Sequence, residues 1–139
     1  MKLRTLDELD SSFALFDNWD DRYRYLIDLG KRLPDMDDSL KTDETLVRGC
    51  TSRVWMVAEF EGDSFHFVAD SDAQIVRGLI YLLMSAYQDK TVEDINTLDI
   101  QKVFEDMGLH GHLSPNRRNG FFAMVDRIKT LAALRTADA

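Results

Sequence analysis

The chain has 139 residues, of which 45% are hydrophobic and 30% charged, a composition typical of one globular domain with a proper core. The formal net charge of −8 argues against nucleic acid and anionic membrane surfaces as partners, because both would repel the protein. No apolar run approaches the ~20 residues that a membrane span needs, so we expect no membrane association.

Two amphipathic helices are predicted at the start of the chain. In the first, apolar residues recur at three- and four-residue spacing: Leu6, Leu9, Phe13 and Phe16. In the second, which Asp17 or Asn18 can cap, the apolar stripe is Trp19, Tyr23, Leu26, Ile27 and Leu33. Pro34 stops this helix, because the residue before a proline is pushed out of the α region. The polar residues 35–45 predict a loop.

A small antiparallel sheet is predicted next. Residues 54–60 alternate with a period of two, residues 64–69 do the same, and Glu61, Gly62 and Asp63 form the turn between them. Leu46 and Val47 can add a short third strand. We therefore expect a three-stranded antiparallel sheet.

The rest of the chain predicts helices. Asp70 or Ser71 can cap a long apolar helix that runs to Tyr87, with its core-facing residues at Ile75, Leu79 and Leu83. Shorter helices follow after the caps Thr91 and Asp99, the latter ending at Gly108. Ser114 and Pro115 begin the last helix. Helices, then a sheet, then helices again indicate an α+β fold, and no linker or repeat divides it, so we expect one domain over residues 1–139.

Cys50 is the first candidate for chemistry. The chain has no other cysteine and no secretory leader is evident, so we expect a cytoplasmic protein that keeps this thiol reduced. A free cysteine is most often a small buried hydrophobe. Here it follows Gly49 just ahead of a strand, which indicates a loop, and Arg48 and Arg53 would favour the nucleophilic thiolate. The residues alone leave an inert and a working thiol equally open.

Other candidates are weaker. His110 and His112 flank a glycine and could bind zinc with Cys50, but their spacing matches no standard site, so we expect no metal. Arg117 and Arg118 lie in the first turn of the last helix, where the helix dipole disfavours cations. Either nearby carboxylates pair with them, or they face an anion or an acidic patch on a partner.

The stretch Gly-Cys-Thr-Ser-Arg-Val-Trp at residues 49–55 resembles the G-C-x-S-x-V-W motif of the SufE family, the sulfur-acceptor partners of cysteine desulfurases. Three further segments match that family in the same order, so the resemblance runs from about Trp19 to about Lys129. They are residues 19–23 with 30–34, residues 70–73 followed by 75–79, and the His-Leu-Ser-Pro-Asn-Arg stretch at 112–117. Thr51 departs from the glutamine that is common in the family.

The resemblance implies a SufE/IscU-like fold and a non-enzymatic function in sulfur transfer. By resemblance Cys50 is the acceptor that takes persulfide sulfur from a SufS- or CsdA-like desulfurase, stimulates that enzyme and relays sulfur for iron–sulfur cluster assembly. By the same resemblance, Arg117 is the arginine of the family's segment near the end of the domain, and it would support Cys50 in sulfur transfer. No cofactor is expected beyond the transient Cys50 persulfide, because pyridoxal phosphate belongs to the partner. The protein that takes the sulfur from Cys50 would be an iron–sulfur scaffold or another sulfur acceptor.

Two other functions fit the same residues. A redox-sensing thiol protein would use Cys50 without a partner desulfurase, although it usually needs a second, resolving cysteine. A plain interaction module would leave Cys50 inert. The sequence leaves open which desulfurase is the partner, whether the cysteine loop is buried at rest, and whether the chain forms a homodimer.

Overall fold

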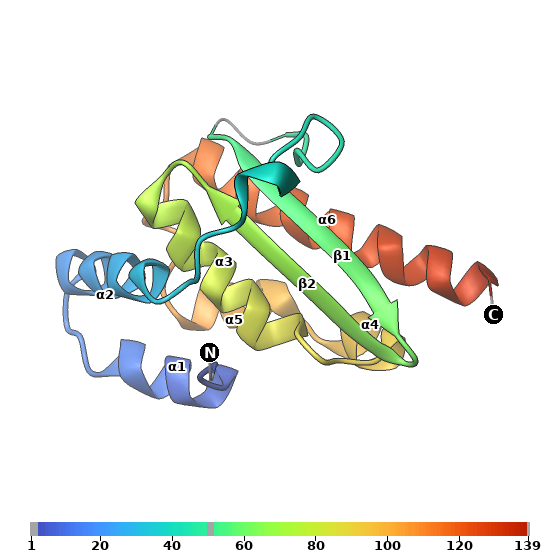
Figure 1. Cartoon of the computed structure of the whole chain (residues 1–139). Helices are drawn as coiled ribbons and strands as arrows, with labels where there is room; N and C mark the ends of the chain where they lie inside the picture. Colours follow the sequence, from blue (N-terminus) through green and yellow to red (C-terminus); the bar gives the residue numbers. More distant parts are fainter. Residues whose placement is uncertain (1–2, 50–51, 139) are drawn as a thin grey trace.

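The computed structural model describes residues 3–49 and 52–138, with side chains described up to residue 135. Its helices and strands are α1 (Leu6–Ala14), α2 (Trp19–Lys31), the short 3-10 helix η1 (Asp38–Leu40), β1 (Val54–Glu61), β2 (Ser64–Ser71), α3 (Gln74–Tyr87), α4 (Val92–Thr97), α5 (Ile100–Asp106) and α6 (Pro115–Asp138). This order confirms the predicted α+β class (Figure 1).

The sheet is an antiparallel hairpin whose register pairs Val54 with Ser71 and Glu61 with Ser64. The predicted third strand is wrong in extent: among the described residues, Leu46 forms only an isolated bridge to Trp55. Two hydrogen bonds of 2.8 Å hold this bridge, from the Val47 N–H to the Val54 carbonyl and from the Met56 N–H to the Thr45 carbonyl, and within the described residues no regular ladder extends beyond it. Gly49, with φ of 91°, sends the chain out of strand geometry after these few residues.

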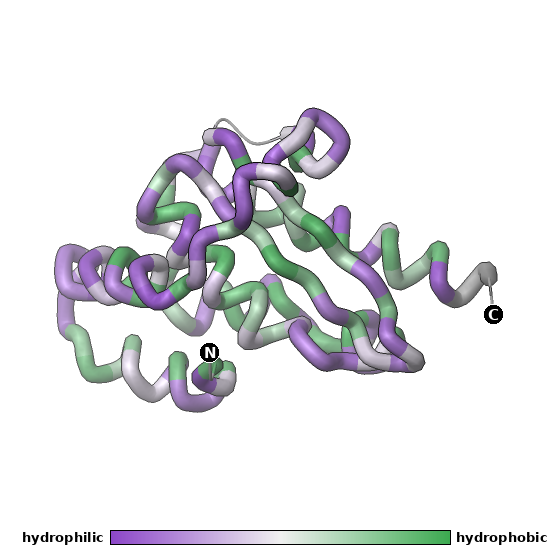
Figure 2. Tube along the Cα trace, in the orientation of Figure 1, coloured by the Kyte–Doolittle hydropathy of each residue, from purple (hydrophilic) through white to green (hydrophobic). Residues whose placement is uncertain are grey.

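Helix α3 is the centre of the molecule, because it contacts β2, α1, α2 and α6. Figure 1 shows α2 on one side of α3, and α6 along the hairpin on the other. The predicted core residues of α3 are all buried: Ile75 is 3% exposed, and Leu79 and Leu83 are 0% exposed. Figure 2 shows hydrophobic residues recurring along this helix, whereas the segment with η1 is mostly hydrophilic.

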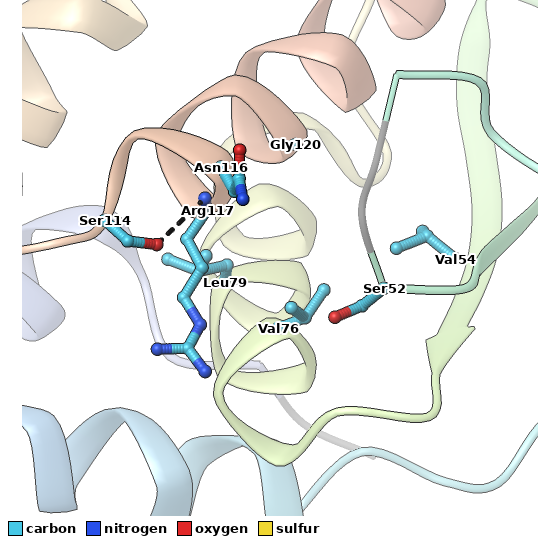
Figure 3. A pocket seen from close by; sticks show the side chains of 8 residues that line it. All are labelled: Ser52, Val54, Val76, Leu79, Ser114, Asn116, Arg117 and Gly120. Carbon is cyan, nitrogen blue, oxygen red and sulfur yellow. Dashed lines mark hydrogen bonds between the residues drawn. The ribbon is translucent and has the colours of Figure 1, made fainter.

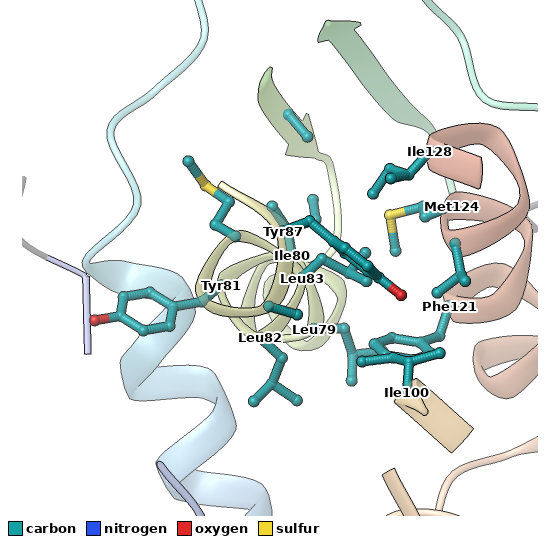
Figure 4. Close-up of a cluster of buried hydrophobic side chains, with 14 of the residues drawn as sticks. Leu79, Ile80, Tyr81, Leu82, Leu83, Tyr87, Ile100, Phe121, Met124 and Ile128 are labelled. Carbon is teal, nitrogen blue, oxygen red and sulfur yellow. The ribbon is translucent and has the colours of Figure 1, made fainter. Parts of the chain in front are cut away.

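The side of α3 that faces α6 carries large apolar side chains. Leu79, Leu83 and Tyr87 lie on this side, and Phe121 and Met124 of α6 lie opposite them (Figure 4). A fully buried aliphatic side chain contributes about 1.5–3 kcal/mol through its removal from water. This packing fixes α6 relative to the hairpin and so places the first turn of α6.

Helices α2 and α3 cross with their backbones in contact. A Cβ atom built on Gly78 would lie 2.2 Å from the Leu26 carbonyl oxygen, and one on Gly30 would lie 2.8 Å from the Gln74 carbonyl oxygen. Any side chain at these two positions would push the helices apart. The glycines therefore set the distance between α2 and α3.

Helix starts follow the predicted capping residues with one exception. Asn18 caps α2, Thr91 caps α4 and Asp99 caps α5, each through its side chain. The predicted cap of α3 by Asp70 or Ser71 is wrong, since the N-cap is Ala73, whose side chain makes no capping hydrogen bond. The Ser71 hydroxyl accepts from the N–H of Ala73 at 3.2 Å, just ahead of the helix. Asp70 is buried instead, in an ion pair described below.

Candidate functional site

The predicted acceptor, Cys50, lies outside the described residues, and so does Thr51; the residues on either side of them are described. A Cβ built on Gly49 would lie 3.3 Å from the Cβ of Ala123 on α6. Ser52, on the other side, is partly buried and directly precedes the residue before β1. Gly49 thus lies near α6, and Ser52 lies near the start of β1.

A cavity of about 290 Å³ opens beside Ser52, and we call it the Ser52 cavity. Its lining combines Ser52, the start of β1, part of α3 and the first turns of α6. The described lining residues are Ser52, Val54, Val76, Leu79, Ser114, Asn116, Arg117 and Gly120 (Figure 3). Sequence positions far apart are brought together here because α6 packs across α3.

The cavity has an apolar side and a polar side. Val54, Val76 and Leu79 are each at most 7% exposed and supply the apolar side. Ser52 approaches from the hairpin and Arg117 from α6, so that the two face the cavity from different sides (Figure 3). Such a mixture suits a small group that has both an apolar and a charged part.

Arg117 is held by the start of α6. The Ser114 hydroxyl accepts a hydrogen bond from the Arg117 backbone N–H at 3.3 Å, which is the predicted cap. Within the part of the chain that the structure describes, the Arg117 guanidinium makes no hydrogen bond or ion pair. The alternative of a local carboxylate partner is therefore not seen among these residues. No acidic residue lies in the first turn of α6 either.

Arg118 lies in a different environment from Arg117. Its Nη1 donates to the His110 carbonyl oxygen at 2.8 Å, which closes the loop between α5 and α6. It does not line the Ser52 cavity. Adjacent arginines that look alike in the sequence thus have separate structural settings.

The histidines do not gather into a site. His112 is exposed and stacks on Trp19, with ring centroids 4.9 Å apart and planes 11° from parallel. His66 lies between two acidic side chains, 2.9 Å from an Asp89 oxygen and 3.5 Å from a Glu61 oxygen. Among the described residues, no three histidine, cysteine or acidic side chains are grouped so that they could hold a metal ion.

Sequence reasoning missed a buried charged network. Asp70 is 2% exposed, and its carboxylate accepts hydrogen bonds from Arg77 and from the Met36 backbone N–H. Lys41 lies 3.5 Å from the same carboxylate, and Arg77 also donates to the Leu33 carbonyl oxygen at 2.7 Å. The network ties the segment after α2 to β2 and α3. Arg77, a single arginine within the apolar stripe of a central helix, is the feature of the sequence that could have indicated this network.

The electrostatics of Asp70 are a balance of opposing effects. Burial raises the pKa of its carboxyl, whereas backbone hydrogen bonds from Met36 and Ser71 and the charges of Arg77 and Lys41 lower it. The net result is a pKa below the ordinary value of 3.8. Asp70 is therefore ionised at neutral pH and can hold both cations.

Asp72 fixes the backbone just ahead of β1. Its Oδ1 accepts a hydrogen bond from the Arg53 backbone N–H at 3.1 Å, and the Arg53 carbonyl accepts one from the Asp72 N–H at 3.3 Å. This double contact joins the residue after Ser52 to the end of β2. The position of Ser52 beside the cavity is set by it.

Comparisons with known proteins agree with this architecture. The family model described as SufE, Fe-S metabolism associated domain, matches residues 7–132. An uncharacterized SufE-like protein of Rhizobium etli is 41% identical over 139 residues, which cover 97% of this chain and 94% of the relative. One of Rhizobium meliloti is 41% identical over 134 residues, covering 94% and 96%.

A solved structure gives the same fold. The solution structure of a hypothetical protein from Thermus thermophilus superposes with a TM-score of 0.75 and covers 99% of both chains. Its sequence identity is 16%, so this likeness concerns the fold alone. No helix in the described part of the chain is long and apolar enough to cross a membrane.

Proposed function

The chain belongs to the SufE family, whose domain is associated with Fe-S metabolism, and from this premise we propose that it is a sulfur acceptor. Cys50 takes persulfide sulfur from a pyridoxal-phosphate-dependent cysteine desulfurase and relays it for iron–sulfur cluster assembly. The protein also stimulates that desulfurase, and it needs no cofactor of its own. The observation that supports this proposal is the Ser52 cavity, which lies two positions along the chain from the only cysteine.

The transfer is a thiolate exchange. The Cys50 thiolate attacks the outer sulfur of the desulfurase persulfide, the old S–S bond breaks, and its electron pair stays on the enzyme's cysteine. Thiolate fraction and access then set the rate. Arg48 and Arg53 flank Cys50 in sequence and are exposed, so their charges favour the thiolate.

Arg117 is proposed as the supporting residue. It is a cation without an ion partner among the described residues, in a cavity that also contains Ser52. A guanidinium there can hold a persulfide anion or meet an acidic group of the desulfurase. Apolar neighbours such as Val54 and Val76 would limit the access of water and reductants to the sulfur.

Mass spectrometry tests the proposal directly. The protein is mixed with a cysteine desulfurase and L-cysteine, and we expect Cys50 to gain one sulfur atom that dithiothreitol removes. Cys50→Ser is the matched control: the near-isosteric change should leave thermal unfolding almost unchanged while abolishing sulfur gain and desulfurase stimulation. A Cys50→Ser variant that stimulates the desulfurase as well as wild type would disprove the acceptor role.

The same measurements separate the other two functions. A redox-sensing thiol would react with hydrogen peroxide at low concentration and gain no sulfur from the desulfurase. An inert thiol in an interaction module would resist iodoacetamide in the native protein.

A further inference from the structure

We propose that the outer edge of β1, at Ala58 and Phe60, accepts an extended segment of another protein as an added strand, and that basic and apolar side chains alternate along this segment. The proposal goes beyond sulfur transfer and does not depend on the position of Cys50. A strand added to an open sheet edge is held by backbone hydrogen bonds, and its alternate side chains give specificity.

The hydrogen bonds at the start of β1 fix the direction of its backbone groups. In an antiparallel pair, successive residues of one strand alternate between bonding to the partner strand and pointing away from it. The Val54 carbonyl and the Met56 N–H both bond to the segment 45–47, so the even-numbered residues of β1 point away from β2. The N–H and C=O groups of Ala58 and Phe60 therefore point outward as well.

These outward groups have no partner within the described residues. The segment 45–47 leaves the edge before it reaches them, and no hydrogen bond is made to the N–H or C=O of Ala58 or Phe60. Figure 1 shows α6 on this side of the hairpin. Its Arg135 lies over the Phe60 ring and donates to the Gly62 carbonyl oxygen at 2.7 Å, in the turn beyond the open positions. The edge between these two contacts is thus open.

The edge of β2 is covered at the corresponding places. The Phe65 N–H donates to the Lys90 carbonyl, and the Asp89 N–H donates to the Phe65 carbonyl, both at 2.8 Å. The side-chain amide of Gln88 accepts from the Phe67 N–H at 2.9 Å and donates to the Phe67 carbonyl at 3.1 Å. Because paired groups cannot bond to a further strand, an added strand fits β1 and not this part of β2.

The solvent-facing side of β1 is negatively charged. Glu59 and Glu61 are exposed and lie on the same side of the strand as Val57. His66, which pairs with Glu59 in the register, lies against Glu61 at 3.5 Å and Asp89 at 2.9 Å. Glu59 has no ion pair among the residues that the structure describes. Opposite charges directly across two strands stabilise the pair, so the added strand should carry lysine or arginine opposite these glutamates.

A second copy of this chain does not fit the same edge. Antiparallel pairing of two β1 strands through both Ala58 and Phe60 would place Glu59 opposite Glu59 of the second copy. Like charges directly opposite each other destabilise a strand pair. The net charge of −8 opposes self-association in the same direction and favours a basic partner. The occupant is therefore a segment of a different protein.

The register fixes the order of side chains in an antiparallel strand on this edge. From its N-terminus, the first and third residues lie opposite Glu61 and Glu59 and are basic. The second and fourth lie opposite Phe60 and Ala58, which pack against the core, and are apolar. The fifth lies opposite Val57 and is apolar too. The peptide acetyl-Lys-Val-Arg-Val-Val-amide has this order and serves as the probe.

Amide hydrogen exchange of the isotope-labelled full chain, followed by NMR, tests the edge. In the protein alone, the amides of Ala58 and Phe60 should exchange much faster than those of Val57 and Glu59, which bond to β2. The peptide at about ten times its dissociation constant should slow exchange at Ala58 and Phe60 about tenfold and shift their resonances. Slow exchange at both residues without peptide would mean that the edge is already covered and would overturn the proposal.

N-methylated peptides separate strand addition from charge attraction. Methyl groups on the second and fourth residues remove the N–H groups that face β1, so binding should weaken at least about tenfold. Methyl groups on the third and fifth residues, whose N–H groups point away, should change binding by less than about threefold. Equal loss in the two methylated peptides, or equally tight binding of a scrambled peptide of the same composition, would overturn the proposal.

Variants test the edge from the side of the protein. Ala58→Pro removes an outward N–H without removing a bond to β2, and it should abolish the peptide-induced shifts. Glu59→Lys should weaken peptide binding about three- to tenfold. Glu105→Lys, at an exposed residue of α5, changes the net charge equally and should have less than about a twofold effect.

Glu59→Lys decides the outcome if Ala58→Pro does not fold, because a change of an exposed charge leaves the hairpin intact. Unchanged affinity in this variant, or equal weakening in Glu105→Lys, would overturn the proposal. Sedimentation of wild type identifies the other occupant: self-association that Glu59→Lys alters and Glu105→Lys does not would place a second copy on the edge and would also overturn it. Sulfur gain on Cys50 is measured separately, so either proposal can fail while the other stands.

Discussion

Ser52 and Arg117 line the same cavity, although one lies at the start of the hairpin and the other in the first turn of the last helix. This relationship depends on α6 packing across α3, which brings the start of α6 close to the start of β1. A change in either residue, or in the packing that brings them together, should therefore affect sulfur transfer.

Arg117→Ala should depress stimulation of the desulfurase by about ten- to a hundredfold, since hydrogen bonds to charged groups contribute roughly 1.5–3 kcal/mol. The melting temperature should change little, because the guanidinium has no described partner to lose. Desulfurase turnover and thermal unfolding are measured side by side on the purified variant.

Arg118→Ala is the control, because Arg118 bonds to the His110 carbonyl and does not line the cavity. Equal loss of stimulation in both variants would indicate a diffuse charge effect. An Arg117→Ala variant that unfolds without a specific transfer defect would remove Arg117 from the site.

Leu79→Ala should lower the free energy of unfolding by about 2–5 kcal/mol, because Leu79 is fully buried and its truncation leaves a cavity. Leu79 also lines the Ser52 cavity, so the neighbouring space can relax into the gap and move the loss toward the lower end. Urea unfolding of the two proteins gives the difference. A loss well under about 2 kcal/mol would show that the site collapses around the smaller side chain.

Gly78→Ala should destabilise the protein more than a surface glycine change does. The added Cβ would lie 2.2 Å from the Leu26 carbonyl oxygen, so α2 and α3 must separate, and overpacking of this kind costs about 1–3 kcal/mol or more. Gly111→Ala is the control, because an added Cβ there meets nothing within 4 Å. Similar unfolding midpoints in urea for the two variants would contradict a rigid crossing at Gly78.

The sequence was sufficient for the α-helices, the hairpin and the family, because periodicity and capping residues are local signals. The core side of α3 and the cap at Ser114 were both predicted from such signals and are both confirmed. The family predicted from the motif around residues 49–55 is confirmed as well. The role of Cys50 stays a prediction, since it lies outside the described residues.

The buried network around Asp70 could not be predicted in the same way. An aspartate just before a helix most often caps that helix, which is why Asp70 was expected to do so. Its actual partners, Arg77 and Lys41, reach it from one turn into α3 and from the segment after α2. The Ser52 cavity could not be predicted for the same reason, because β1, α3 and α6 are brought together only by tertiary packing.

Asp70→Asn should lower the free energy of unfolding by about 3 kcal/mol near neutral pH, because it removes the buried carboxylate of Arg77 and leaves that mostly buried guanidinium with the exposed Asp35 as its acidic partner. Asp72→Asn is the control, since Asp72 is exposed and an amide oxygen can still accept from the Arg53 N–H.

The effect of Asp70→Asn on the free energy of unfolding should depend on pH. The pKa of the Asp70 carboxyl is lowered by the fold from 3.8, so its contribution is fully present above that value and is lost as the pH falls through the folded-state pKa. The difference in unfolding free energy between wild type and Asp70→Asn should therefore be constant from about pH 7 to about pH 5 and shrink below about pH 4. Urea unfolding across this range measures it. A difference that grows on acidification would mean that the folded state raises the pKa of Asp70, and the ion pair would then not stabilise the fold.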